Sequence, residues 1–334
     1  MTDLGKGKIV VTGGAGFIGS AVVWELNRRG LTNILVVDFL DTDEKWRNLV
    51  PLQFLDYIEA DDFLNRIEDS PQLFGDVSCT FHLGACTSTT EQDAAYLIRN
   101  NFEYTKKLAQ FALSAGRRFV YASSAATYGA LEAQVSETIP LESLRPLNMY
   151  AYSKHLFDRY AERTGMLPRI AGLKYFNVFG PNEDHKGDMR SVVRKAFEQA
   201  QTGSVKLFNS YRAEFAHGEQ RRDFVYVKDA AAATVFLAEY EKGGGLFNIG
   251  SGEANTWLAL IEGVFEALGR EPQIAFVEMP ESIRDRYQYF TCADIGKLRA
   301  AGYDQPITPL KDAVADYVKN YLVPRRRLGE EKPS

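Results

Sequence analysis

Cysteine and histidine are scarce in this chain of 334 residues, which holds three cysteines and four histidines. The cysteines, Cys79, Cys86 and Cys292, show no CxxC spacing, so neither a disulfide framework nor a cysteine-based zinc site is expected. His185 and His217 fall in polar loop-like stretches without ligand-like partners. The sequence therefore predicts no metal site, and its unpaired thiols fit a reducing cytoplasm.

Long hydrophobic runs and a surplus of basic residues are also absent. The longest apolar run, residues 230–238, is far shorter than the ~20 residues of a membrane-spanning helix. No apolar segment typical of a signal peptide precedes the first predicted strand. The 39 lysines and arginines are outnumbered by 44 acidic residues, and the net charge is -5. We therefore expect a cytoplasmic protein that binds neither membranes nor nucleic acid.

What the first half does contain is an alternation of short apolar runs and helix-like segments. The apolar runs, bounded by glycine and polar residues, are residues 8–11, 33–38, 78–83, 118–121 and 170–175. The helix-like segments include residues 21–29, 96–115 and 151–163. This alternation predicts an α/β fold of the Rossmann type, a doubly wound parallel sheet with helices on both faces.

The pattern loosens after about residue 177. Short strands are expected at residues 205–208 and 246–249, among helices such as residues 257–268. We predict that residues 1–176 form mainly the cofactor-binding Rossmann domain and residues 177–334 mainly a smaller mixed α/β substrate lobe, with the chain crossing between the two. Ligands of open α/β sheets bind at the carboxyl ends of the strands, so the site is expected between these parts.

A glycine-rich turn follows the first predicted strand. Gly13, Gly16 and Gly19 have the spacing GxxGxxG, the first predicted helix follows, and Asp38 ends the next strand. Glycines let the backbone approach a pyrophosphate at the positive end of a helix, so this segment predicts dinucleotide binding. An acid such as Asp38 suits the ribose hydroxyls of NAD. Lys45 could instead pair with the 2'-phosphate of NADP, or be an ordinary loop charge.

Tyr150 and Lys154 form a YxxxK pattern within a predicted helix. Residues four apart share one face of a helix, and a nearby ammonium favours the phenolate, which can then act as a base. The alternative is a surface pair without function. Ser124, just past a predicted strand, could hold a substrate oxygen, and the Asn100–Asn101 pair could support proton transfer. Together these residues favour a catalytic site.

The motifs taken together resemble a known family. TGGAGFIGS, SSAATYG and YAYSK are similar to the extended short-chain dehydrogenases/reductases that act on nucleotide sugars. More narrowly, HLGACTSTTEQD, MYAYSKHLFD, KYFNVFGP, HKGDM and RYQYFTCADI resemble the ADP-L-glycero-D-manno-heptose 6-epimerases. The resemblance runs from about residue 8 to residue 322. It implies an isomerase that inverts C6 of ADP-heptose by transient oxidation and hydride return, as part of lipopolysaccharide inner-core synthesis.

The resemblance also implies roles for particular residues. Tyr150 and Lys186 would be the bases on the two faces of the reacting carbon, Ser124 would bind its oxygen, and Lys154 would bind the nicotinamide ribose. Three acids, Glu183, Asp184 and Asp188, lie close to Lys186 in the sequence. Because a carboxylate beside an amine raises its pKa and makes it a poorer base, we predict that these acids face away from the site.

The binding residues implied by the resemblance form two sets. Cofactor contacts would fall on Gly13, Gly16, Phe17, Ile18, Gly19, Asp38, Lys45, Leu83, Gly84, Ala85, Cys86, Thr87, Asn100, Lys154 and Val178. Substrate contacts would fall on Ser124, Asn177, Lys186, Asp188, Lys195, Phe208, Asn209, Ser210, Tyr211, Arg222 and Tyr287. The family favours NADP over NAD, a nucleotide sugar as substrate and a homo-oligomeric assembly.

The chain departs from the family pattern at several positions. Phe39 stands where an asparagine is usual, Ala60 where a lysine often contacts the cofactor, and Lys195 where a histidine contacts the substrate. Asp188 replaces a serine, and residues 212–220 form a longer segment. A 4-epimerase or reductase of the same family stays open as an alternative, as does a non-catalytic NADP-sensing scaffold. The alanines after Ser124 argue against a 4,6-dehydratase, which needs an acid pair there.

Overall fold

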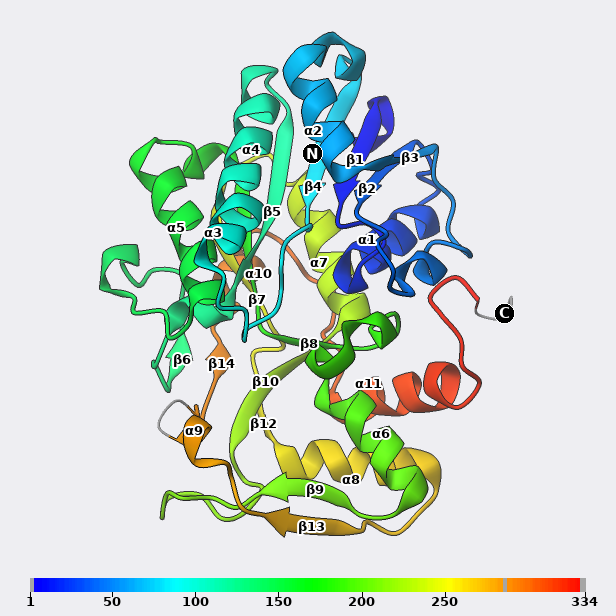
Figure 1. The fold of residues 1–334 in the computed structure, drawn as a ribbon, viewed down its shortest axis with the longest axis vertical. Coiled ribbons are helices and arrows are strands. Elements are labelled where there is room, and N and C mark those ends of the chain that lie inside the picture. Colours follow the sequence, from blue (N-terminus) through cyan, green and yellow to red (C-terminus); the bar gives the residue numbers. More distant parts are fainter. Residues whose placement is uncertain (1–2, 285–286, 331–334) are drawn as a thin grey trace.

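The computed structural model describes residues 3–284 and 287–330. Its central feature is a seven-stranded sheet with the strand order β11-β7-β5-β4-β1-β2-β3 (Figure 1). All neighbouring strands in this main sheet are parallel. The strands are β1 (Lys8–Thr12), β2 (Ile34–Asp38), β3 (Asp56–Glu59), β4 (Val77–His82), β5 (Arg118–Ser124), β7 (Ala171–Tyr175) and β11 (Gly245–Ile249). The predicted Rossmann-type fold is confirmed.

Helices cover both faces of the main sheet. Along β1, Ile9 and Val11 belong to the apolar cluster that includes α1 and α7, whereas Val10 belongs to the cluster of α2, α4 and α5 on the other face. Burial on both faces explains why such strands read as continuous apolar runs. The helices are α1 (Phe17–Arg28), α7 (Val227–Glu239), α2 (Ala60–Asp69), α4 (Tyr104–Ser114) and α5 (Met149–Arg163).

The strand order reverses between β1 and β4, the point at which open α/β sheets bind ligands. Thr12 and His82, the last residues of these strands, are paired in register. The amide of Leu83 then donates to the carbonyl of Thr12 at 3.0 Å. The glycine-rich turn and residues 83–87 therefore lie together at the carboxyl edge of the main sheet.

A smaller lobe lies below this edge in Figure 1. It contains a mixed three-stranded sheet of order β12-β10-β8 and the parallel pair β13-β9. Helix α8 packs against both α6 and α11. The elements of the lobe are β8 (Asn177–Phe179), α6 (Val192–Thr202), β9 (Val205–Phe208), β10 (Arg221–Tyr226), β12 (Ala254–Thr256), α8 (Trp257–Leu268), β13 (Ile274–Val277), α9 (Glu281–Arg284) and α11 (Leu310–Asp316).

Shorter elements connect these parts. The parallel pair β6-β14 joins a loop of the first half to the second half. No helix within residues 3–284 and 287–330 has the length and apolar character needed to cross a membrane. The connecting elements are β6 (Gln134–Val135), β14 (Cys292–Ala293), α3 (Ala94–Leu97), α10 (Gly296–Ala300), the 3-10 segment η8 (Asp184–Met189) and the π-helical segments η4 (Ile98–Glu103) and η9 (Tyr317–Leu322).

One expectation about the individual elements was wrong, and one strand was missed. Residues 246–249 do not belong to the smaller lobe, since β11 pairs with β7 at the edge of the main sheet. The chain therefore crosses back after residue 226, through α7 and β11. The helix expected at residues 96–115 is confirmed, since residues 94–114 are helical throughout and the π-helical segment η4 joins α3 to α4. Strand β3 was missed, because only one of its four residues is buried and its sequence lacks an apolar run.

Candidate active site

Two cavities open at the carboxyl edge of the main sheet and share Ala85 in their walls. The central cavity, with a volume of about 420 Å³, is lined by both the sheet and the smaller lobe. The peripheral cavity, of about 670 Å³, is lined by the ends of β1 and β2, the start of α2 and residues 96–107. The four catalytic candidates Ser124, Tyr150, Lys154 and Lys186 all line the central cavity.

Tyr150 and Lys154 are placed by the first two turns of α5. Asn148 caps this helix by accepting a hydrogen bond from the Ala151 amide at 2.8 Å. Lys154 lies one turn beyond Tyr150, and its ammonium donates to the carbonyl of Ala122 at 2.9 Å. Burial lowers the pKa of Lys154 to about 8, against a smaller opposing effect of Asp158. The helix therefore directs both side chains toward the end of β5.

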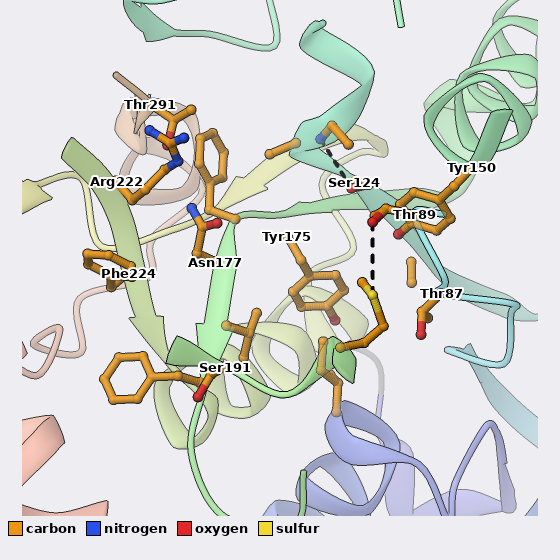
Figure 2. Close-up of a pocket in the computed structure, with 18 of the residues that line it drawn as sticks. Thr87, Thr89, Ser124, Tyr150, Tyr175, Asn177, Ser191, Arg222, Phe224 and Thr291 are labelled. Atoms are coloured by element: carbon orange, nitrogen blue, oxygen red, sulfur yellow. Dashed lines mark hydrogen bonds between the residues drawn. The ribbon is translucent and has the colours of Figure 1, made fainter. Parts of the chain in front are cut away.

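Ser124 ends β5 and lies beside Tyr150 in the cavity (Figure 2). Its hydroxyl accepts a hydrogen bond from the Ala126 amide at 3.1 Å. Burial raises the pKa of Tyr150, and a hydrogen bond with Ser124 acts in the opposite direction. In this structure the hydrogen bond with Ser124 therefore favours the phenolate of Tyr150, while the Lys154 ammonium is bound to the carbonyl oxygen of Ala122.

Lys186 approaches the same cavity from the loop between β8 and α6. Its ammonium lies 5.3 Å from the centre of the Phe17 ring at the start of α1. Burial lowers the pKa of Lys186, and the charge of Glu183 opposes this shift. A lowered pKa is what an amine needs to accept a proton near neutral pH. The position and environment of Lys186 are thus compatible with a base.

The three acids near Lys186 make contacts elsewhere. Glu183 accepts hydrogen bonds from Ser191 and Tyr317. Asp184 pairs with Arg194 at 2.8 Å. Asp188 is exposed, and its carbonyl accepts a hydrogen bond from Lys195 at 2.6 Å. No ion pair links Lys186 to an acid within the described part of the chain. This agrees with the prediction that the three acids face away from the site.

The smaller lobe supplies the wall that faces Ser124 and Tyr150. Figure 2 shows Arg222 and Thr291 across the cavity from them, with Asn177 between. Arg222 is 8% exposed, and its guanidinium donates to the carbonyls of Arg221 and Gln288. It also lies 5.8 Å from the ring of Trp257 and 5.3 Å from that of Tyr287. A guanidinium held in this way is suited to binding a diphosphate.

Several predicted substrate residues lie outside the lining of the central cavity. Phe208 and Tyr287 pack edge to face, with ring centres 6.4 Å apart, on the side of the Arg222 guanidinium. Tyr211 is exposed and donates to Glu278. The predicted residues that do not line the cavity are Asp188, Lys195, Phe208, Asn209, Ser210, Tyr211 and Tyr287.

Sequence reasoning missed other lining residues. Trp257 begins α8, and Thr291 lies just before β14. The Thr291 hydroxyl is buried without a hydrogen-bond partner among the described residues, as expected of a group that a ligand would complete. Met189 also lines the cavity, and its sulfur lies 4.0 Å from the Thr89 hydroxyl. No sequence signal marks these residues, because they are far apart along the chain.

The glycine-rich turn has the close packing that a dinucleotide site requires. Gly13 has φ of 69°, and a Cβ there would come within 2.5 Å of the Gly84 amide nitrogen. A Cβ on Gly19 would come within 1.9 Å of the Gly13 carbonyl oxygen. Helix α1 begins after Gly16 without a side-chain cap, so its first amide groups can bind phosphate oxygens. This turn fits the pyrophosphate of a dinucleotide cofactor.

The remaining cofactor candidates line one or both cavities. Phe17, Ile18, Leu83, Ala85, Thr87 and Val178 line the central cavity, and Asp38, Lys45, Gly84, Ala85, Cys86 and Asn100 line the peripheral cavity. Of the asparagine pair, Asn101 is buried and binds the amide and carbonyl of Cys86. Asn100 faces the peripheral cavity. Asn101 therefore holds the loop after β4, while the side-chain amide of Asn100 donates to the Tyr96 carbonyl at 2.9 Å.

Charged groups of both signs surround the peripheral cavity. The Asp38 carboxylate accepts hydrogen bonds from the amides of Ala15 and Phe39 at 2.9 and 2.8 Å. The Lys45 ammonium lies 3.3 Å from the same carboxylate. Ala60, the position of a lysine in the family pattern, lines this cavity together with Arg99 and Lys107. No group of metal-ligating side chains occurs within the described ranges.

Comparison with known proteins defines the class to which this site belongs. Residues 9–250 match the family model of the NAD dependent epimerase/dehydratase family, and the chain belongs to this family of Rossmann-fold enzymes. The ADP-L-glycero-D-manno-heptose-6-epimerase of Nitratidesulfovibrio vulgaris (strain Hildenborough) is 49% identical, over 94% of this chain and 97% of that protein. The enzyme of that name from Fusobacterium nucleatum is 42% identical, over 94% and 98% of the two chains. Within the family, the chain belongs to the ADP-L-glycero-D-manno-heptose-6-epimerases.

Solved structures agree with this assignment. The ADP-L-glycero-D-manno-heptose-6-epimerase of Helicobacter pylori has a TM-score of 0.79 and 26% identity, with 96% of this chain and 98% of that chain covered. A UDP-glucose 4-epimerase from Thermotoga maritima has a TM-score of 0.76 at 26% identity, with coverages of 94% and 99%. The fold is thus common to nucleotide-sugar epimerases.

Proposed function

We propose that this isomerase inverts C6 of ADP-D-glycero-D-manno-heptose to give the L-glycero epimer, with NADP as its cofactor and the inner core of lipopolysaccharide as the destination of its product. The observation that carries the proposal is that Tyr150 and Lys186, which come from different elements, line one cavity together with Ser124. An enzyme that oxidises and reduces one carbon on its two faces uses a proton acceptor on each face.

The protein groups divide the proton transfers between them. One of the two bases removes the hydroxyl proton as a hydride leaves C6. After the resulting carbonyl has rotated to present its opposite face, the hydride returns to C6 and the other base gives a proton to the oxygen. Ser124 donates a hydrogen bond to this oxygen between the two steps. Arg222 binds the diphosphate and leaves the sugar free to rotate. When bound, the nicotinamide cofactor supplies the hydride acceptor and donor.

The preference for NADP rests on the groups at the peripheral cavity. The Asp38 carboxylate already accepts from two backbone amides and Lys45, so it has little capacity left for ribose hydroxyls. The cations available to a 2'-phosphate are Lys45, Arg99 and Lys107, which line the cavity together with the acids Asp38, Asp41, Asp61 and Glu103. The cofactor released from denatured protein identifies the natural ligand. Tighter binding of NAD+ than of NADP+ would contradict this part of the proposal.

A stereochemical assay tests the reaction. Purified enzyme is incubated with ADP-D-glycero-D-manno-heptose, and the two C6 epimers are resolved by chromatography. We expect approach to the same epimer ratio from either side. Absence of interconversion, with turnover of UDP-galactose instead, would identify a 4-epimerase and refute the proposal.

We also place the enzyme in the cytoplasm as a homo-oligomer. Its three free cysteines fit a reducing compartment. The oligomeric state follows only from the family resemblance, and light scattering during gel filtration measures it directly.

A further inference from the structure

The loop that carries Lys186 is held by buried polar residues that have no part in the proposed proton transfers. Asn182 is 3% exposed and Glu183 is 1% exposed. Both precede the 3-10 segment η8, in which Lys186 lies. Buried polar side chains are retained where their hydrogen bonds are made, so the partners of these two residues indicate what they hold in place.

Asn182 has a left-handed backbone conformation and joins three separate parts of the chain. Its φ is 78°, a conformation that asparagine tolerates better than most residues. Its side-chain amide donates to Ser20 Oγ of α1 at 3.0 Å, and its side-chain oxygen accepts from the Leu328 amide at 3.1 Å. Asn182 therefore ties the loop to the first helix and to the carboxyl-terminal segment.

Asn48 extends this connection to the glycine-rich turn. Its side-chain amide donates to the carbonyl of Asn182 at 3.1 Å and to that of Ala15 at 3.0 Å. Asn48 is itself 3% exposed. One side chain thus bridges the turn that fits the cofactor pyrophosphate and the loop that carries Lys186.

Glu183 anchors the other side of the loop. Its carboxylate accepts hydrogen bonds from the amide and hydroxyl of Ser191, the cap of α6. The Tyr317 hydroxyl donates to the same carboxylate at 3.0 Å. The Glu183 carbonyl accepts from the Lys186 amide at 3.0 Å. The hydrogen bonds of the carboxylate are thus made to the start of α6 and to η9, and no ion pair between it and Lys186 is formed.

We propose that Asn182 and Glu183 are positioning residues that hold Lys186 over the central cavity, on the side opposite Tyr150. The inference rests on the proposed function, because it takes Lys186 as one of the two bases. Asn182 sets the loop against α1, where Phe17 packs under the Lys186 ammonium, and Glu183 sets it against α6. Neither side chain contacts the substrate or the cofactor in this role.

Single turnover with each epimer separates positioning from general destabilisation. With two bases, each C6 epimer begins its reaction with a different base, so the first oxidation can be followed separately for the two. The enzyme loaded with oxidised cofactor is mixed with each epimer in turn, and the absorbance of the reduced nicotinamide is recorded. K186M identifies which epimer depends on Lys186.

We expect E183A and N182A to slow oxidation of the Lys186-dependent epimer about 10- to 100-fold, because a catalytic group misplaced by about 1 Å lowers the rate by up to about 100-fold. Oxidation of the other epimer should change less than about twofold. E183Q keeps one acceptor oxygen for the hydroxyls of Ser191 and Tyr317, but its NH2 group replaces the oxygen that accepts from the Ser191 amide, so it is expected to restore only part of the rate. N182G keeps the left-handed backbone but lacks the hydrogen bonds, and it is expected to behave as N182A does.

The control is D229N, which alters another carboxylate that holds a distant segment through Thr308. It is expected to leave the ratio of the two oxidation rates unchanged. Equal slowing with both epimers, or full activity of E183A and N182A, would overturn the inference. If E183A does not fold, E183Q and N182G still decide the question. Failure of the wild-type enzyme to act on either epimer would instead refute the proposed function.

Discussion

Tyr150 and Lys186 face the same cavity, but different kinds of structure support them. Tyr150 lies in a 15-residue helix, and local geometry alone places Lys154 beside it. Lys186 lies in a 3-10 segment next to Gly187, whose φ is 51°. Its loop is held by contacts from α1, α6, η9 and the carboxyl-terminal segment. One base is therefore set by local structure and the other by long-range contacts.

The region around α5 and the Lys186 loop also differ in the groups that contact their buried carboxylates. Beneath α5, Lys174 and Asp158 form an ion pair of 3.0 Å with side chains 1% and 0% exposed. Ser123 and Tyr121 donate to the same carboxylate at 2.7 and 2.8 Å. The ion pair thereby links α5 to β5 and β7. In the Lys186 loop, by contrast, hydroxyl and amide groups satisfy Glu183. The buried carboxylate of the helical region is thus paired with a buried cation, whereas the buried Glu183 carboxylate is held by neutral donors and has no ion-pair partner among the described residues.

The largest expected effect is that of Y150F on the rate. Loss of the phenolic hydroxyl removes one proton acceptor and should lower kcat by about 10²- to 10⁴-fold. The aromatic ring stays, so the melting temperature should be close to that of the wild type. The epimer assay measures the rate and circular dichroism checks the fold. A Y150F enzyme with wild-type kcat would show that the base of the helical region has been misassigned.

The next largest effect is on stability and tests the buried ion pair. D158N leaves the Lys174 ammonium buried without its counter-charge and should cost about 3–5 kcal/mol of unfolding free energy. The double variant D158N/K174M removes both charges and should recover part of this loss. Urea denaturation measures both. If the double variant is less stable than the sum of the two single variants predicts, charge pairing is not the reason for this contact.

A pH dependence of intermediate size follows from Lys154. Burial lowers its pKa from 10.5 to about 8, so between these values the unfolded chain binds more protons than the folded one. The unfolding free energy of the cofactor-free protein should therefore rise with pH across this window, by at most about 1.4 kcal/mol per pH unit. K154M should flatten the rise. A wild-type curve equally flat from pH 8 upward would contradict the lowered pKa.

The smallest effect is expected for D184N in the Lys186 loop. Asp184 pairs with Arg194, but its side chain is 52% exposed, and such pairs contribute about 0–1 kcal/mol. We therefore expect little change in stability or in kcat. A large loss of activity in D184N would mean that an exposed ion pair, rather than Asn182 and Glu183, sets the loop. Thermal denaturation and the epimer assay together distinguish these cases.

Much of the site was predictable because it depends on short spacings. Gly13 and Gly16 lie in the turn before α1 and Gly19 lies in its first helical turn, while Tyr150 and Lys154 lie in adjacent turns of one helix. The proximity within each group therefore follows from backbone geometry. The main errors concern long-range pairing. Residues 246–249 read as an isolated short strand, although their partner, β7, lies far earlier in the chain. The contribution of Thr291 to the cavity had no local signal either.

The sequence by itself determined the class of fold, the cofactor turn and the helix that bears Tyr150, since these depend on periodicity and on residues within one or two turns. Only the tertiary structure decided where Lys186 lies. Its loop is polar and short, and nothing in its own sequence gives it a unique conformation. Contacts with Ser20, Ser191, Tyr317 and Leu328 do so, and they exist only once α1, α6 and the carboxyl-terminal segment have packed together.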